Sequence, residues 1–258
     1  MAYPDVMIFS PPKTGTSSLF YILGQNPAIN KSVVKEVQYF SCDYNHGRGL
    51  DWYAEHWEDV EGLKMESSPN YYPSEECRDR IAEECETLKT ITIARDPVQR
   101  FVSQYVHFKG MNENGMVYRN ISFTGIETEA DEFMEMMSPG YDFEKKQQWV
   151  EKDMLLGGVY LPGLRWVHET YGTENNLLLD YEEYNKNNQW ASDTCCDFLG
   201  INRHEFQNVR VNTARLYQQK RRVIDDITQE HRDRLAEFYR EHNKEFFSYT
   251  GRDFGWNA

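Results

Sequence analysis

The sequence predicts an α/β fold in which helices flank a central parallel sheet, within a single domain that spans residues 1–258. Apolar or β-branched runs of strand length lie at 6–9, 90–94 and 176–180. A stretch with helical periodicity follows each run, and strands that alternate with helices indicate crossover connections in a parallel sheet. A chain of 258 residues, 40% of them hydrophobic, is long enough to bury a core of that kind.

Local patterns define the elements before the second strand. Ser74 is a suitable N-cap, because its hydroxyl can accept a hydrogen bond from the first turn of a helix. The elements expected there are a loop over 10–16, a helix over 17–25, a short extended segment over 35–40, a helix over 51–57, a short strand over 64–66 and a helix near 75–85.

The second half of the chain is less regular. Asp96 and Pro97 form an N-cap and N1 pair that starts a helix running to Lys109. Residues 110–148 are rich in Gly and Asn and contain an acidic helix-like piece near 127–137; we expect a lid or substrate-loop insertion here. The further elements expected are a helix over 147–171, broken at Gly157-Gly158 and Pro162-Gly163, and helices within 183–199 and 228–248.

The loop after the first strand carries the strongest functional signal. Its sequence is Ser-Pro-Pro-Lys-Thr-Gly-Thr-Ser-Ser-Leu over 10–19, between an apolar run and a helical pattern. A loop in this position directs free backbone N–H groups and the positive end of a helix at one point, which favours an anion. Lys13 adds a full charge before Gly15, unlike the G-x-x-x-x-G-K-[ST] loop of nucleotide-binding proteins. The alternative is a strand–helix turn that happens to contain a lysine.

A second basic position follows the second buried strand. Arg95 stands at the end of 90–94, where ligands bind in open α/β sheets, and Ser103 lies two helical turns further on. Arginine makes forked contacts with phosphate, and a hydroxyl can add one more. The alternative is that Arg95 caps a helix or pairs with an acid.

These two stretches resemble the cofactor motifs of sulfotransferases that use 3′-phosphoadenosine 5′-phosphosulfate. Pro-Lys-Thr-Gly-Thr-Ser-Ser-Leu is similar to the 5′-phosphosulfate loop, and Arg-Asp-Pro-x-x-Arg-x-x-Ser is similar to the 3′-phosphate motif. The resemblance implies the P-loop-like sulfotransferase fold, with adenosine 3′,5′-bisphosphate as product and no metal. It also implies the cofactor-binding residues, which are Lys13, Thr14, Gly15, Thr16, Ser17 and Ser18 at the 5′ end, Arg95 and Ser103 at the 3′-phosphate, and Lys220 and Arg221 in a basic loop that closes over it.

Further segments resemble heparan sulfate sulfotransferases in particular. These are 35–40 (Lys-Glu-Val-Gln-Tyr-Phe), 68–72 (Ser-Pro-Asn-Tyr-Tyr) and the C-terminal 251–256. The resemblance implies that Glu36 is the general base for the acceptor and that Lys13 meets the oxygen that leaves sulfur. Two positions depart from the group, because Ser67 replaces a lysine and Gln38 replaces a histidine. These departures point to a different mode of acceptor recognition.

The function expected from the resemblance is in-line transfer of a sulfuryl group to a hydroxyl or amine acceptor. Two alternatives stay open, a P-loop nucleotide kinase or nucleoside-triphosphate hydrolase, and a non-catalytic nucleotide-binding module of the same fold. Preference for ATP with Mg²⁺ over adenosine 3′,5′-bisphosphate would favour the kinase or hydrolase. A turnover assay separates the enzyme from the binding module.

Bulk properties narrow the partners. The net charge of −14 opposes nucleic acid and other long polyanions, but it is compatible with one small anionic donor and a small-molecule or saccharide acceptor. The five cysteines form no disulfide framework, and the seven histidines show no metal-binding spacing. We see neither a signal peptide nor an apolar run of membrane-spanning length and expect a cytoplasmic protein, or a Golgi-lumen one if the sequence is part of a longer chain. The oligomeric state is not encoded in any pattern that we recognise.

Overall fold

The computed structural model describes residues 3–113, 129–138, 140–142, 149–207 and 226–256. The chain divides into two compact units, which are Met1–Arg95 with Pro162–Val211, and Asp96–Leu161 with Asn212–Ala258. Each unit is described by itself. The prediction that one domain covers residues 1–258 stays a prediction.

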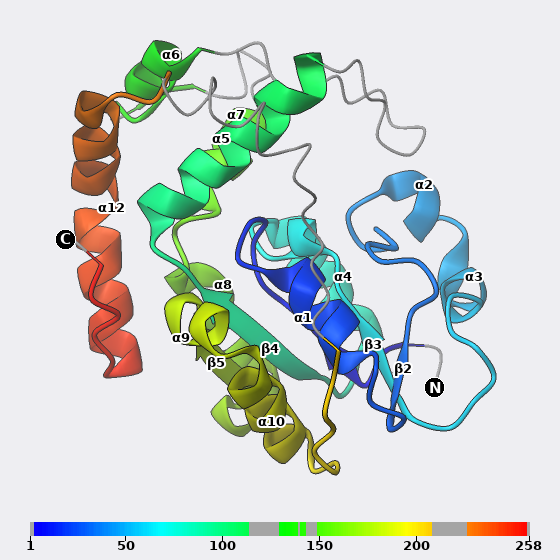
Figure 1. Ribbon diagram of the computed structural model, residues 1–258. Helices are drawn as coiled ribbons and strands as arrows, with labels where there is room; N and C mark the ends of the chain where they lie inside the picture. Colours follow the sequence, from blue (N-terminus) through cyan, green and yellow to red (C-terminus); the bar gives the residue numbers. More distant parts are fainter. Residues whose placement is uncertain (1–2, 114–128, 139, 143–148, 208–225, 257–258) are drawn as a thin grey trace. The chain divides into compact units, whose positions relative to one another are not determined.

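The first unit contains a five-stranded sheet in which every neighbouring pair is parallel. Its strands are β1 (Val6–Met7), β2 (Ile29–Lys31), β3 (Leu63–Glu66), β4 (Lys89–Ala94) and β5 (Asn176–Asp180), in the order β2-β3-β1-β4-β5. The chain therefore places β2 and β3 on one side of β1 and β4 and β5 on the other (Figure 1). The order of the strands therefore reverses between β1 and β4. In open parallel sheets, ligands usually bind beyond the carboxyl ends of the two strands at such a reversal. The predicted α/β class with a parallel sheet is confirmed.

The two faces of the sheet are covered by different helices because side chains alternate along each strand. Val6, Ile8 and Ile93 belong to one apolar cluster with α1 (Thr16–Leu23) and α10 (Asn188–Leu199). On the opposite face, Phe9 packs against Trp166 of α8 (Leu161–Tyr171), with ring centroids 5.2 Å apart. The same face carries α4 (Glu75–Glu84), which Ser74 caps by accepting the N–H of Cys77, as predicted.

Short elements complete the first unit. They are α2 (Asp43–His46), α3 (Gly49–Ala54), η1 (Pro69–Tyr71), η2 (Thr173–Asn175) and α9 (Tyr181–Lys186). The structure differs from the sequence analysis at two places here. It contains strand β2, which was not predicted. Segment 35–40 is not extended as expected, because Glu36 and Gln38 adopt left-handed backbone conformations with φ of 64° and 59°.

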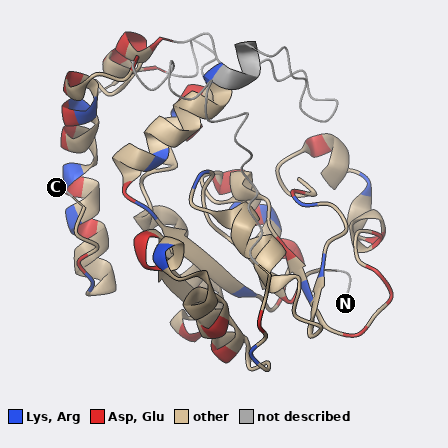
Figure 2. Ribbon diagram, in the orientation of Figure 1, with Lys and Arg blue, Asp and Glu red and all other residues tan. Residues whose placement is uncertain are grey.

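The second unit is helical over its described residues. It contains α5 (Pro97–Glu113), α6 (Ala130–Met136), α7 (Trp149–Leu156) and α12 (Gln229–Thr250). Its core includes Phe101, Tyr105 and Phe133, and α12 carries Lys and Arg interspersed with Asp and Glu (Figure 2). The helix expected over 147–171 is broken at Gly157-Gly158 as predicted, into α7 and α8. The break expected at Pro162-Gly163 is wrong, because these residues lie in the first turn of α8. The expected lid over 110–148 lies largely outside the described residues and stays a prediction.

Candidate active site

The lysine loop, which we define as residues 8–15, is tied to the centre of the sheet by its own hydroxyl groups. Ser10 Oγ donates to the carbonyl of Ile93 at 2.9 Å and accepts the N–H of Ile93 at 3.1 Å. Thr14 Oγ1 donates to the carbonyl of Pro11 at 2.9 Å and lies 2.8 Å from Ser10 Oγ. Both hydroxyls are fully buried. Because Thr14 uses its side chain inside the loop, we expect its backbone amide, rather than its hydroxyl, to meet a ligand.

The backbone of the loop is shaped to expose the start of α1. Lys13 and Gly15 have positive φ values of 72° and 92°. Gly15 is the N-cap of α1, and the described residues supply neither a side-chain cap nor an acidic group in the first turn. By contrast, Asp180 caps α9 by accepting two amides. The positive end of α1 is therefore not offset by a carboxylate of its first turn, and it fits a phosphate group.

Glycine is required at position 15 for two reasons. Its φ of 92° is rarely adopted by other residues. A Cβ atom there would also lie 2.8 Å from Cε1 of Tyr184 and 3.3 Å from Cε2 of Tyr181. The two tyrosines of α9 therefore close one side of the loop.

Arg95 lies directly beside this loop. Its Nη1 donates to the carbonyl of Lys13 at 2.8 Å, and its guanidinium lies 4.4 Å from the ring centre of Tyr181. A guanidinium has five N–H donors, and the bond to Lys13 uses one of them. The structure thus joins the two basic positions that the sequence places 82 residues apart, at the carboxyl ends of β1 and β4.

The base segment, residues 35–38, follows β2 at the same carboxyl edge of the sheet. The Nζ of Lys35 lies 2.5 Å from Oε1 of Glu36, and Lys35 is only 8% exposed. Asn45 of α2 donates to the carbonyls of Val37 and Gln38 at 3.2 and 3.3 Å. Among the described non-glycine residues, only Lys13, Glu36 and Gln38 have positive φ. Such backbone strain concentrates at functional sites because the surrounding structure must enforce it.

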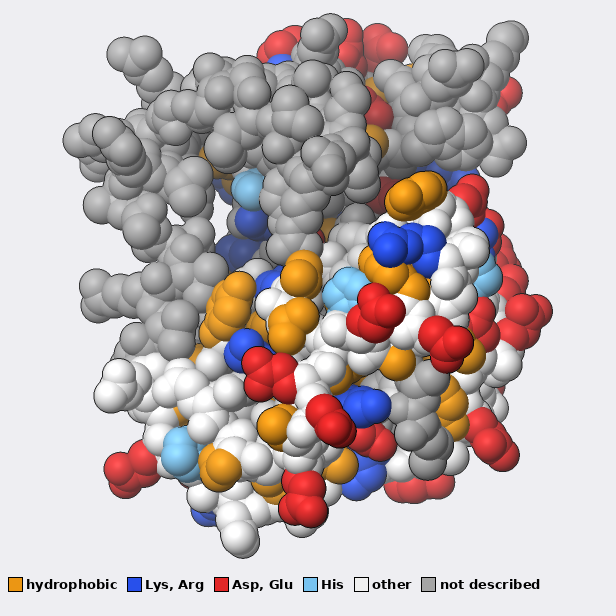
Figure 3. Space-filling model, turned by 90° about the vertical axis from the view of Figure 1, so that its right-hand side faces the viewer, with side chains coloured by type: hydrophobic (Ala, Val, Ile, Leu, Met, Phe, Trp, Pro, Cys, Tyr) orange, Lys and Arg blue, Asp and Glu red, His pale blue; other side chains and the backbone are white. Residues whose placement is uncertain are grey.

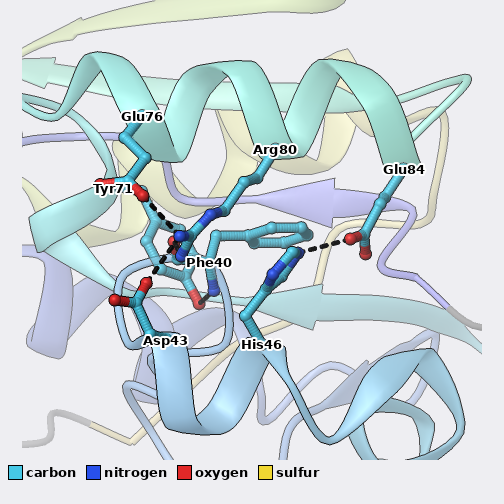
Figure 4. A network of polar contacts seen from close by, with 7 residues as sticks. All are labelled: Phe40, Asp43, His46, Tyr71, Glu76, Arg80 and Glu84. Carbon is cyan, nitrogen blue, oxygen red and sulfur yellow. Dashed lines mark hydrogen bonds and ion pairs between the residues drawn. The ribbon is translucent and has the colours of Figure 1, made fainter.

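A polar network holds the chain just beyond the base segment (Figure 4). Arg80 of α4 donates to the carbonyl of Phe40 at 3.1 Å and pairs with Asp43 at 2.6 Å. His46 lies 2.6 Å from Glu84, and the N–H of Phe40 donates to the Tyr71 hydroxyl at 3.3 Å. These contacts tie α2 to α4 and fix the exit of the base segment.

Glu66 is a further polar group of this region that the sequence motifs did not single out. It ends β3, its side chain is fully buried, and burial raises its pKa from 4.5 to about 7. The hydrogen bond from Ser68, the charge of Lys35 and the amide of Val37 oppose that rise. An acidic residue at the carboxyl end of a buried strand was the available signal, but burial itself is a tertiary property.

The remaining predicted site residues are spread over several parts of the chain. Thr16 is buried at the start of α1, and Ser17 and Ser18 are half-buried in its first turn. Ser103 is half-buried on α5 of the second unit. Lys220 and Arg221 lie outside the described residues. Their roles at the cofactor stay predictions.

The second arginine of the Arg-Asp-Pro-x-x-Arg pattern has a structural position. Arg100 is fully buried in the second unit, where it donates to Gln104 and to the carbonyl of Met154. Tyr239 of α12 donates to the neighbouring carbonyl of Leu155 at 2.8 Å. Arg100 thereby ties α5 to α7 within the second unit.

The described residues show neither a metal-binding cluster of side chains nor a membrane-spanning helix. No group of three or more His, Cys, Asp or Glu within the described ranges is arranged to hold a metal ion. None of the described helices combines the length and apolar character needed to cross a bilayer.

Comparison with known proteins identifies relatives of the whole chain. The family model described as "Sulfotransferase domain" matches residues 3–253. A mouse bifunctional heparan sulfate N-deacetylase/N-sulfotransferase 4 is 25% identical over 94% of this chain and 29% of its own length. Mouse heparan sulfate glucosamine 3-O-sulfotransferase 3A1 is 26% identical over 99% of this chain and 65% of its own length. The chain thus spans less than two thirds of these relatives. A crystal structure of a sulfotransferase from Alicyclobacillus acidocaldarius shares the fold, with a TM-score of 0.74 and 21% identity over 98% of both chains.

Proposed function

Because the chain belongs to the sulfotransferase family, we propose that it transfers a sulfuryl group from 3′-phosphoadenosine 5′-phosphosulfate to a hydroxyl or amine acceptor. The observation that carries the proposal is the contact between Arg95 and the carbonyl of Lys13. It brings the Arg95 guanidinium to the loop that carries Lys13 and leads into α1, at one edge of the sheet, which suits a phosphorylated donor.

The proposed reaction is an in-line displacement at sulfur. The acceptor oxygen or nitrogen forms a bond to sulfur while the bond from sulfur to the 5′-phosphate oxygen breaks. That oxygen keeps the electron pair and leaves as part of adenosine 3′,5′-bisphosphate, and the acceptor proton passes to the carboxylate of Glu36. Lys13 stabilises the charge that grows on the leaving oxygen. As in phosphoryl transfer, the protein mainly positions groups and neutralises charge.

The proposed acceptor is a small molecule or a saccharide. Relatives of this chain are named for heparan sulfate. The face turned to the viewer in Figure 3 carries acidic and basic side chains side by side, with apolar side chains as separate spots. A face of mixed sign and a net charge of −14 do not favour a long polyanion, so we propose a neutral or cationic acceptor of modest size. A cytoplasmic location stays a prediction.

The donor is tested by calorimetric titration with adenosine 3′,5′-bisphosphate and with ATP plus Mg²⁺. Preferential binding of the bisphosphate is expected, and preferential binding of ATP with Mg²⁺ would favour a kinase or nucleoside-triphosphate hydrolase instead. Turnover is tested by screening alcohols, phenols, amines and saccharides with ³⁵S-labelled donor. Binding without transfer to any acceptor would favour a non-catalytic module.

Two variants assign the residues. Lys13→Ala is expected to abolish transfer, whereas Lys244→Ala, on an exposed lysine of α12, should leave it unchanged. Glu36→Gln should keep bisphosphate affinity and lose transfer, because Gln keeps the shape of the side chain but cannot accept the proton. Full activity in Glu36→Gln would exclude this residue as the base.

A further inference from the structure

Glu66 is a buried carboxyl group beside the base segment that the proposed reaction does not use. Its side chain has no exposed surface. A carboxyl group is costly to bury unless hydrogen bonds and opposite charge compensate it. Its partners therefore indicate what it does.

The partners of Glu66 lead directly into the base segment. The Ser68 hydroxyl donates to Oε1 of Glu66 and accepts the N–H of Gln38 at 3.1 Å. The amide of Val37 is a second hydrogen-bond partner of the Glu66 carboxyl group. A serine hydroxyl has one proton, so the proton given to Glu66 leaves the oxygen lone pairs of Ser68 for Gln38. The carboxyl group thus orients the hydroxyl that holds the loop.

The loop needs this support because its backbone is strained. Glu36 and Gln38, two residues apart, both adopt positive φ, which non-glycine residues rarely do. The hydrogen bonds to Val37 and Gln38 act on the two amides that follow Glu36. Without them, the backbone can relax to an ordinary conformation and move the Glu36 carboxylate.

Glu66 also fixes the strand that leads to the lysine loop. Its backbone carbonyl accepts the N–H of Ile8 at 2.9 Å, and it is paired in register with Met7 of β1. One residue therefore joins the base segment through its side chain and the lysine loop through its backbone. Glu66 can therefore fix the distance between the base segment, which carries Glu36, and the lysine loop, where the donor is proposed to bind.

From this arrangement we propose that Glu66, acting through Ser68 and Lys35, is a positioning residue for Glu36. The inference rests on the proposed function, in which Glu36 accepts the acceptor proton. Lys35 is almost buried and contacts Glu36 at 2.5 Å, and its charge also acts on Glu66. When Glu66 is ionised, its carboxylate accepts the hydrogen bonds of Ser68 and Val37 more strongly than the neutral acid does, so the base segment is held more firmly.

The titratable and charged groups that face Glu66 come from several elements. They are Lys35 and Glu36 of the base segment, Tyr53 of α3, Tyr71 of η1 and Cys85 at the end of α4. Burial raises the pKa values of Tyr53, Tyr71 and Cys85 far above neutrality, so they stay uncharged. Burial raises the pKa of Glu66 to about 7, so its charge changes within the range of an ordinary assay.

The experiment compares Glu66→Gln, Ser68→Ala and the control Glu83→Gln, an exposed residue of α4, with the unmodified chain. The first readout is kcat/KM for transfer from about pH 6 to about pH 9. The unmodified chain and the control should rise through about pH 7. Glu66→Gln should lose that rise and be about tenfold or more slower at the alkaline end, with unchanged affinity for adenosine 3′,5′-bisphosphate.

Ser68→Ala tests the direction of a shift in the pH dependence of kcat/KM, which a merely structural role would not produce. The hydrogen bond from Ser68 lowers the pKa of Glu66, so its loss should move the rise in kcat/KM to higher pH. A fall by the same factor at every pH in both variants would overturn the proposal. This variant also keeps the test valid if Glu66→Gln does not fold.

The second readout is independent of activity. Hydrogen exchange at the amides of Val37 and Gln38 should accelerate in both variants and not in Glu83→Gln. If the unmodified chain transfers no sulfuryl group, the proposed function fails, but exchange still reports whether Glu66 holds the loop. Unchanged exchange in both variants would overturn the positioning role even in an active enzyme.

Discussion

Replacing Glu66 with Gln should remove a loss of stability that the unmodified chain suffers as the pH rises towards neutrality, although it weakens catalysis. The carboxyl group has a pKa of 4.5 when exposed and about 7 in the folded chain, because burial disfavours its charge. Below pH 4.5 both states are protonated, and the group has no effect. Between these values the unfolded chain has released its proton while the folded chain retains it, so stability falls as pH rises.

The magnitude follows from the two pKa values. Each pH unit between 4.5 and about 7 contributes 1.36 kcal/mol, which gives about 3 kcal/mol of destabilisation that is complete above about pH 7. Gln cannot ionise, so Glu66→Gln should not show this pH-dependent destabilisation. The variant can carry a constant offset, because its amide nitrogen needs an acceptor such as the Tyr53 hydroxyl, which lies 3.5 Å from Oε2 of Glu66.

The assay is urea unfolding followed by tryptophan fluorescence at a series of pH values from about 4 to about 8. The difference in unfolding free energy between Glu66→Gln and the unmodified chain should grow in favour of the variant by about 3 kcal/mol over this range. Other titrating groups cancel in the difference, and Glu83→Gln should give a flat difference. A flat difference for Glu66→Gln as well would refute the reasoning, because it would mean that Glu66 is not destabilised by burial.

Three further variants test the lysine loop. Thr14→Val keeps the shape and removes the hydroxyl bonded to Pro11 and Ser10, so thermal unfolding should show a loss of about 1–3 kcal/mol while Thr14→Ser stays close to the original. Gly15→Ala must accept a φ of 92° and a contact with Tyr184, so unfolding should show a loss of about 2 kcal/mol or more, and calorimetry should show weaker binding of adenosine 3′,5′-bisphosphate. Arg95→Lys keeps the charge but loses the forked geometry and the stacking on Tyr181, so bisphosphate affinity should fall about tenfold; unchanged affinity would remove Arg95 from the donor site.

Local patterns predicted the parts of the fold that depend on local sequence. The buried strand over 90–94 has four β-branched residues in five, and the structure has β4 there. The Asp96-Pro97 pair starts α5, and Asp96 accepts the amides of Val98 and Gln99 as an N-cap should. The loop between β1 and α1 is predicted from Lys13 and its neighbours, and its contact with Arg95 follows from the parallel order of the strands.

Elements set by tertiary contacts were missed. Strand β2 has only three residues, and its middle residue, Asn30, is buried because its amide donates to the carbonyls of Glu58 and Val60. Within segment 35–40, residues 36–39 alternate between polar and apolar side chains, a pattern that favours an extended strand. Hydrogen bonds from Asn45 of α2 and to Ser68, which is 30 residues away, hold the segment with Glu36 and Gln38 in left-handed conformations instead.

The threonines and serines of this site differ in whether their hydroxyl groups bond to the protein or can face a ligand. Ser10, Thr14 and Ser68 are buried and spend their hydroxyls on the protein, two on the lysine loop and one on the base segment. Hydroxyl donors in a motif predict ligand contacts only where the side chain faces away from the core, and that is decided by packing. We therefore expect backbone amides and the cations of Lys13 and Arg95 to hold the anion. Substitutions of these buried hydroxyls should affect binding only through stability, which separate measurements of unfolding and bisphosphate affinity can distinguish.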